Sequence, residues 1–373
     1  MKFVVAGLLI LQCLIASAQQ SVLQRKLDSL RQAGNFPGLS VAIIIDNKPV
    51  LPLVSGFNDI EENLVLKTTD RFMQGSVGKT YASAIAIDLI KRKKISLDDK
   101  VSMYLGSYPW FDKIPNAADI TIQMLMNHTS GVMRYEFNPN FLKDLTAQPD
   151  KEWKPAELLN YILEQKASFE AGKGWEYSDT NYILLGMIIE AVTGKTFYRL
   201  VKQQLLDKWE LSNTFPSDRR RLPGLSQGYA GPENEFGGKE KVVGEDGLFI
   251  INPQFEWTGG GIYSTTSDLA TWGHYLYGGQ VIDTTLLLAL PVAAKLGRDT
   301  KYAQGVIIRP TSLGTAYGHS GFFPGYMTEL LHFPNSRMTI AVQTNSSNFK
   351  NLKLGLMRVL LIMATEALNQ SKQ

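Results

Sequence analysis

The hydrophobic pattern of the chain begins with a helix and then turns to short strands. Residues 21 to 33 place apolar side chains on one face of an amphipathic helix. Two β-rich runs follow, LSVAIIID and PVLPLVSGF, which are joined through Asp46 and Asn47. Turn-forming residues between two such runs are typical of a β-hairpin. We therefore expect the folded part to open with one helix and two paired strands.

The pattern becomes helical in the middle of the chain and returns to strands near its end. Between about 77 and 211 the spacing is mostly helical, most clearly in AELLNYILEQ and in the segment from Asn181 to Leu206. The later runs GGIYST, YAQGVIIRP, YMTELLHFP and MTIAVQTN are β-rich, and an apolar helix closes the chain from about Leu352 to Leu368. This order predicts an α+β fold, with one antiparallel sheet built from the N- and C-terminal segments, flanked by helices, and an inserted all-helical lobe.

The length of the chain suggests how these parts are divided. Its 373 residues exceed what a single hydrophobic core usually serves, so we expect two lobes that share one cleft. The predicted domain covers 19–373, with a sheet lobe at about 19–70 and 255–373 and a helical lobe at about 77–250.

The first 18 residues have the pattern of a secretory signal peptide. Lys2 precedes an apolar stretch, and small residues at Ala16 and Ala18 predict cleavage after Ala18. The apolar stretch is shorter than the roughly 20 residues that span a bilayer, so we expect no stable membrane span after cleavage. The protein is predicted to be exported, either periplasmic or secreted. Cys13 is the only cysteine, so the mature chain would have no disulfide, no thiol nucleophile and no thiolate metal site.

Charge and motif content exclude several classes of function. The formal net charge is only +3, and the one basic run, KRKK at 91–94, is typical of a solvated helix end, so no nucleic-acid partner is expected. The four histidines lie far apart without a His-Glu-x-x-His spacing, so no metal is expected. No phosphate-binding loop or dinucleotide fingerprint follows a strand, so the predicted cofactor is none.

The first candidate for chemistry is a serine followed three residues later by a lysine. Residues three apart share one face of a helix, so the Lys79 amine would reach the Ser76 hydroxyl and activate it as a nucleophile. The apolar run after Lys79 would bury the lysine and lower its pKa toward that of a useful base. A second copy, Ser347 to Lys350, lies in a polar connection between a strand and a helix, where helix capping explains the serines.

Two further motifs follow in order, Tyr177-Ser178-Asp179 at a helix start and His319-Ser320-Gly321 on a late strand. A tyrosine between a serine and a lysine can be held partly ionised and can transfer the proton. A strand that lines a cleft can offer amides, a hydroxyl and an imidazole to a substrate. Taken singly, the Tyr177 motif is explained by N-capping, and the His319 motif is explained by a β-bulge or a turn with a solvent-facing histidine. Their fixed order favours catalysis.

In order and spacing the three motifs resemble the serine β-lactamase and penicillin-binding superfamily, in the branch of class C β-lactamases and D-alanyl-D-alanine carboxypeptidases. That branch also contains D-amino-acid peptidases and esterases. The resemblance implies that Ser76 is acylated, that Lys79 and Tyr177 handle the proton, and that the amides of Ser76 and Phe322 hold the oxyanion. It also implies a small-molecule or peptide acyl substrate, with cell-wall peptide among the candidates. ITIQMLMNHTSGV and GGGIYSTTSDLATWG are similar to scaffold segments of the superfamily, and we interpret His128 in the first as structural.

The chain departs from the superfamily pattern at several positions that bear on the substrate. Asp179 stands where asparagine is usual, which adds a negative charge that would raise the pKa of Lys79, and Asn181 could supply the amide instead. His319 replaces a permanent cation, and Phe322 adds apolar bulk to the predicted substrate-binding set.

We therefore predict an exported serine hydrolase that acts on an ester, a D-amino-acid amide or a β-lactam. A D-alanyl carboxypeptidase or esterase with poor β-lactam turnover is favoured. A class C β-lactamase and a penicillin-binding sensor without turnover stay open as alternatives.

Overall fold

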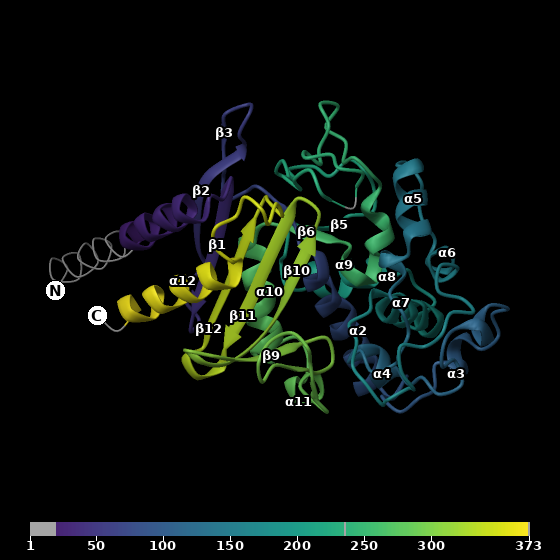
Figure 1. Cartoon of the computed structure of the whole chain (residues 1–373). Helices are drawn as coiled ribbons and strands as arrows, with labels where there is room; N and C mark the ends of the chain where they lie inside the picture. The colour runs from purple at the N-terminus through teal and green to yellow at the C-terminus, as the bar shows by residue number, and fades with distance from the viewer. Residues whose placement is uncertain (1–19, 235, 372–373) are drawn as a thin grey trace.

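The large sheet is built from both ends of the chain, as the pattern predicted. The computed structural model describes residues 20–234 and 236–371, so the predicted signal peptide lies outside the described residues. Nine strands form one antiparallel sheet in the order β3-β2-β1-β12-β11-β10-β9-β8-β7 (Figure 1). The strands are β1 (Gly38–Ile45), β2 (Leu51–Asp59), β3 (Leu64–Val65), β7 (Val292–Ala293), β8 (Lys301–Tyr302), β9 (Ile307–Thr311), β10 (Gly314–Phe323), β11 (Tyr326–Phe333) and β12 (Met338–Thr344).

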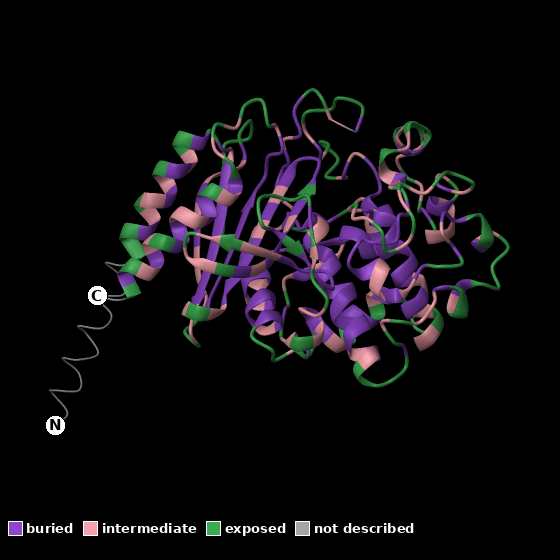
Figure 2. Ribbon diagram, turned by 60° about the horizontal axis from the view of Figure 1, so that its bottom comes forward, coloured by how far each residue is buried: buried purple, intermediate pink, exposed green. Residues whose placement is uncertain are grey.

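Both faces of the central strands are buried, because helices cover the sheet on each side (Figure 2). The β1 and β12 strands pair in the register Val41 to Val342, and their side chains alternate between the faces. One face packs against a helix at residues 20–34 and against α12 (Leu356–Ser371). The other face packs against α10 (Thr266–Tyr277) and, through it, the helical part of the chain.

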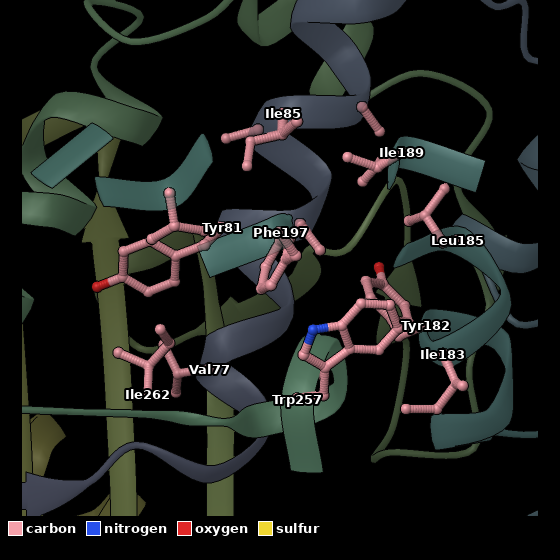
Figure 3. Close-up of a cluster of buried hydrophobic side chains, with 14 of the residues drawn as sticks. Val77, Tyr81, Ile85, Tyr182, Ile183, Leu185, Ile189, Phe197, Trp257 and Ile262 are labelled. Atoms are coloured by element: carbon pink, nitrogen blue, oxygen red, sulfur yellow. The ribbon is translucent and has the colours of Figure 1, made fainter. Parts of the chain in front are cut away.

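The helix α2 (Lys79–Lys91) runs through the middle of the molecule and is buried on nearly every side. Its Ala- and Ile-rich sequence suits such a position, because a helix that is apolar all round belongs in a core. Tyr81 stacks on Trp272 of α10, and the Trp272 indole nitrogen donates a hydrogen bond to Thr80. Side chains of α7 (Asp179–Thr193) pack on the opposite side (Figure 3).

The remaining helices are short. They are η1 (Gly75–Gly78), α3 (Ser102–Leu105), η2 (Phe111–Lys113), α4 (Ile122–Met126), η3 (Tyr135–Phe137), α5 (Pro139–Ala147), α6 (Pro155–Leu159), α8 (Phe197–Leu200), η4 (Val201–Leu206), η5 (Pro253–Glu256), α9 (Trp257–Gly260), α11 (Thr284–Leu287) and η6 (Pro334–Ser336). No helix among the described residues is both long and apolar enough to cross a membrane.

Several predicted elements differ in detail. The run GGIYST gives β6 (Ile262–Ser264), which joins β4 (Phe72–Met73) and β5 (Thr214–Pro216) in a separate three-stranded sheet. Since β5 lies inside the range 77–250, the inserted lobe is not wholly helical. The helix predicted from Asn181 to Leu206 is broken by Gly194, which adopts a left-handed conformation (φ 65°) and ends α7. In AELLNYILEQ only the first part is helical, because α6 ends at Leu159.

The hydrophobic core also divides differently from the two lobes that we expected. One continuous cluster extends from the inner face of the sheet through α10 and α2 into the helical part. A second cluster lies between the outer face of the sheet and the terminal helices. The boundary between cores is therefore the sheet itself, and the helical lobe is fused to the inner face of the sheet through α2.

Candidate active site

Ser76 and Lys79 lie side by side at the start of α2. Ser76 is in η1, a 3₁₀ turn, and Lys79 is the first residue of α2. Residues three apart eclipse one another in a 3₁₀ turn. The Lys79 Nζ accordingly donates a hydrogen bond to Ser76 Oγ at 3.2 Å and another to the carbonyl oxygen of Gly259 at 2.6 Å. Lys79 is fully buried, whereas Ser76 is half-buried and reaches two cavities.

The residue before the serine must be glycine because the main chain of β10 passes directly against it. Gly75 has φ +52°, and a Cβ atom there would lie 2.7 Å from the amide nitrogen of Phe322 and 2.5 Å from its carbonyl oxygen. The contact places the Phe322 main chain beside the residue that precedes Ser76. The two amides predicted to hold an oxyanion, those of Ser76 and Phe322, therefore belong to main-chain segments in contact.

Tyr177 lies over the lysine. The Lys79 Nζ is 4.9 Å from the centre of the Tyr177 ring, and the tyrosine hydroxyl is buried without a hydrogen-bond partner in the described structure. Burial raises the pKa of Tyr177, and although Lys79 acts in the opposite direction, the pKa stays above its usual value. The resting site thus holds Tyr177 as a neutral phenol, contrary to the partial ionisation that we expected.

Asp179 forms a buried ion pair with Lys79. Burial alone would lower the pKa of Lys79, but Asp179, with smaller effects from Tyr177 and Glu256, outweighs it and raises the pKa. Burial would conversely raise the pKa of Asp179, yet Lys79 and Arg134 hold it below its usual value. The expectation that burial would make Lys79 a free base is therefore wrong for the resting site. The lysine is a cation that donates to Ser76.

His319 is placed in the wall of the larger cavity, but both of its ring nitrogens are occupied by the protein. Burial, followed by Lys79, lowers the pKa of His319 to about 3, so the ring is neutral. Nδ1 lies 2.6 Å from the carbonyl oxygen of Ser320 and must carry the proton, and Nε2 accepts from the Tyr302 hydroxyl at 2.9 Å. The imidazole therefore does not offer a nitrogen to a substrate as predicted. The solvent-facing alternative is also wrong, because His319 is buried.

Ser320 connects two charged side chains that the sequence did not reveal. Its Oγ accepts a hydrogen bond from Arg309 Nη2 at 2.7 Å and donates to Glu329 Oε2 at 2.6 Å. Burial raises the pKa of Glu329 to about 6, although Arg309 opposes this. Arg309 thus supplies a permanent cation that His319 does not provide, but Glu329 on the same hydroxyl largely balances its charge.

Asn181 does not take the role that we predicted for it. Its side chain is fully buried; Oδ1 accepts from Ser130 Oγ at 2.6 Å, and Nδ2 lies 3.1 Å from His128 Nδ1. His128 follows α4 in a left-handed conformation, packs 4.3 Å from the Tyr177 ring and accepts the amide of Ser178. His128 therefore packs against Tyr177 while Asn181 contacts His128, and neither residue lines either of the two cavities at Ser76.

The second serine and lysine pair is not a catalytic pair. Ser347 Oγ accepts a hydrogen bond from the amide of Gly325 at 2.9 Å, while Lys350 forms an ion pair with Glu233 at the surface. Ser347 supports the turn after β10 and does not cap a helix as we had expected.

Two cavities of different character meet at Ser76. The larger, about 680 Å³, is lined by Tyr177, Ser76 and the β10 residues His319 to Phe322, with Arg309 and Glu329 on its wall. The smaller, about 190 Å³, is lined by Ser76, Asp179, phenylalanines and three charged residues that no local pattern marked, Arg134, Glu136 and Glu256. Phe322 is at the rim, where its ring stacks on Phe349. No group of His, Cys, Asp or Glu in the described part of the chain could hold a metal ion.

Comparison with known proteins identifies relatives of this arrangement. The Beta-lactamase family model matches residues 23–363. A penicillin-binding protein of Bacillus subtilis (strain 168) is 28% identical over 309 residues, which are 78% of this chain and 64% of that protein. A D-aminopeptidase of Brucella anthropi is 24% identical over 87% of this chain and 59% of its own length. The chain thus spans less than two thirds of these curated relatives.

Solved structures share the fold over nearly the whole chain. The D-amino acid amidase of Ochrobactrum anthropi SV3, in a complex with L-phenylalanine amide, superposes with a TM-score of 0.80 at 20% identity and covers 95% of this chain and 100% of its own. A D-stereospecific amidohydrolase from Streptomyces sp. superposes with a TM-score of 0.76 at 22% identity, and the match covers 94% of this chain and 97% of that protein. These likenesses establish the α+β fold.

The position of Tyr177 and Lys79 generates a first prediction. Tyr177→Phe and Lys79→Ala should each lower the rate at which Ser76 is acylated by at least ~10²-fold, because each removes a positioned proton-transfer group. Stopped-flow measurement with a chromogenic ester gives this rate, and thermal melts check folding. Tyr108→Phe, on an exposed tyrosine, is the control. Unchanged rates in both folded variants would show that the proton takes another route.

The ion pair generates a second prediction. Asp179→Asn removes the main charge that opposes burial at Lys79, so the pKa of Lys79 should fall. The acid limb of the pH profile of kcat/KM should then move to lower pH. At pH 7 activity should rise by about tenfold for each unit that the pKa falls toward neutrality. The profile from pH 5 to 9 measures this shift, with exposed Asp112→Asn as control. A large loss of activity in a folded variant would instead show that Asp179 itself accepts the proton.

Proposed function

Because the chain belongs to the beta-lactamase family, we propose that it is a serine hydrolase whose Ser76 forms an acyl-enzyme with an amide or ester substrate. The observation that carries the proposal is the arrangement around Ser76. The Lys79 ammonium lies 3.2 Å from Ser76 Oγ, the Tyr177 ring lies over that ammonium, and the Phe322 main chain lies against Gly75. A nucleophile, its proton carriers and candidate oxyanion amides are thus within one site that opens to two cavities.

The reaction follows from these positions. From the form of the site in which Lys79 has lost a proton, the Ser76 oxygen attacks the carbonyl carbon as its own proton passes to Lys79 Nζ, and the carbonyl oxygen becomes negative beside the Ser76 and Phe322 amides. Collapse breaks the bond to the amine or alcohol, which leaves with that proton, and the acyl group stays on Ser76. Water then attacks the acyl-serine, and the acid is released as Ser76 regains its proton.

D-amino-acid amides, peptides and esters are the substrates that we propose. The D-aminopeptidase and D-amino acid amidase names among the relatives support this class. The Arg309, Ser320 and Glu329 group supports the further expectation that β-lactams turn over slowly. A β-lactam carboxylate beside Ser320 would meet the cation of Arg309 together with the carboxylate of Glu329.

The function is tested by acylation of Ser76. Intact-mass measurement after incubation with a fluorophosphonate or an activated D-alanyl ester should show one added group, and peptide mapping should place it between Gly75 and Lys79. Steady-state assays should show faster hydrolysis of small neutral esters than of benzylpenicillin. Ser347→Ala is the matched control and should label normally. Labelling that survives Ser76→Ala would overturn the proposal.

We also propose that the protein is exported, since residues 1–18 have the pattern of a signal peptide. Expression of the full chain in a bacterial host should give a mature protein that begins at Gln19, in the periplasm or the medium. N-terminal sequencing of the fractionated protein measures this. An intact N-terminus in the cytosol would contradict the proposal.

A further inference from the structure

The smaller cavity at Ser76 has an acidic floor and an apolar wall. Asp179, Glu136 and Glu256 lie along it, together with Arg134. The wall consists of aromatic and aliphatic side chains: Phe137, Phe141, Leu142, Leu145, Phe236, Phe255, Phe322 and Phe323. At about 190 Å³ the cavity is smaller than the range of about 300–1,000 Å³ typical of a whole drug-sized ligand. It is therefore suited to one residue of a substrate.

The charges on the floor do not balance. In the described part of the chain, Lys79 pairs with Asp179, and Arg134 pairs with Glu136 Oε1 at 2.6 Å, which leaves Glu256 with no cation in contact. The second oxygen of Glu136, Oε2, is buried without a hydrogen-bond partner. Three carboxyl groups thus face two cations.

The main chain holds Glu256 next to the nucleophile. Trp257, the following residue, has φ 37°, an unfavourable value for a residue with a side chain. A Cβ atom on Gly260 would lie 2.2 Å from Glu256 Oε2 and 3.0 Å from the carbonyl of Gly75. The carboxylate therefore occupies space that a side chain at 260 would fill, beside the turn that carries Ser76.

The raised pKa values of Glu256 and Glu136 are consistent with a site that lacks a bound cation. Burial, with Asp179 adding to it, raises the pKa of Glu256 to about 8 and that of Glu136 to about 7. Lys79 and Arg134 act in the opposite direction on Glu256, and Arg134 does so on Glu136, without restoring the usual pKa values. A bound cation would relieve this cost, because an opposite charge within a few ångströms favours the ionised carboxylate.

We propose that the smaller cavity binds an unblocked N-terminal residue of the substrate, with its free ammonium group between Glu136 and Glu256 and its apolar side chain against the phenylalanines. The enzyme would then release an amine or peptide from a free amino acid unit and would not act as a carboxypeptidase. An α-amino group with a pKa of about 7.7–8.0 is mostly charged at pH 7. The inference rests on the proposed function, since Ser76 must attack the carbonyl of that same unit.

Two compounds that differ only in the amine test this assignment. D-Phenylalaninamide and 3-phenylpropanamide are titrated calorimetrically into Ser76→Ala at pH 7, where no acyl-enzyme can form. The amine-bearing compound should bind at least ~10-fold more tightly, since a charge-assisted contact is stronger than a neutral one. Adding Glu256→Gln or Glu136→Gln should each remove most of this preference. Exposed Glu170→Gln should leave it unchanged.

Equal affinity for the two amides, binding of neither, or a preference that survives both glutamine variants would overturn the inference. If one glutamine variant fails to fold in thermal melts, the other decides the outcome. Failure here is distinguishable from failure of the proposed function, because acylation of wild-type Ser76 by a neutral ester or a fluorophosphonate requires no ammonium. If Ser76 is acylated normally but the amine does not increase affinity, the proposed function stands and the assignment of the smaller cavity to an ammonium group is wrong.

Discussion

The active site depends on one buried ion pair, between the first residue of α2 and the first residue of α7. Both helices direct their amino ends at the same point, and a helix amino end favours negative charge. Asp179 is well placed at such an end, whereas Lys79 is not, and a buried cation without a partner is costly. The pair resolves this conflict and ties the two helices together. Ser76 lies one turn before Lys79 and Tyr177 two residues before Asp179, so the same contact fixes the nucleophile relative to the phenol.

The sequence predicted best those features that depend on neighbours along the chain. Runs rich in β-branched and other apolar residues identified the long strands of the large sheet, and the spacing of Ser76 and Lys79 was enough to predict their contact. The sequence-based prediction was wrong where it depended on the direction in which a side chain points. Asn181 was expected to replace Asp179 functionally, yet residues two apart on a helix do not share a face, and Asn181 points to Ser130 and His128.

The charged residues around the serine could not have been found from local pattern. Glu256 lies 180 residues from Ser76 in the sequence, and the residues next to Arg309 form no recognisable motif. Only the fold therefore brings these two residues to the site. For a similar reason, the sequence could not predict whether the pKa of Lys79 is raised or lowered. Burial and Asp179 act in opposite directions, and only their actual distance decides between them. Ser76 therefore lies between a cavity whose lining includes Arg309, Lys353 and Glu329 and a cavity whose lining includes Asp179, Glu136 and Glu256. This difference in charge gives the site a direction along its substrate.

The main-chain contact between Gly75 and Phe322 has a consequence for how this enzyme can diverge. The position of the Phe322 amide is set by backbone packing, whereas the Phe322 side chain is 40% exposed and stacks on Phe349. Selection can therefore replace the side chain at 322 freely while the amide stays where it is. Position 75, in contrast, tolerates nothing but glycine. The side chain at 322 thus affects which substrates bind, whereas Gly75 and the main chain at 322 maintain catalysis. Substitutions at 322 can therefore change the substrate range while the enzyme stays active.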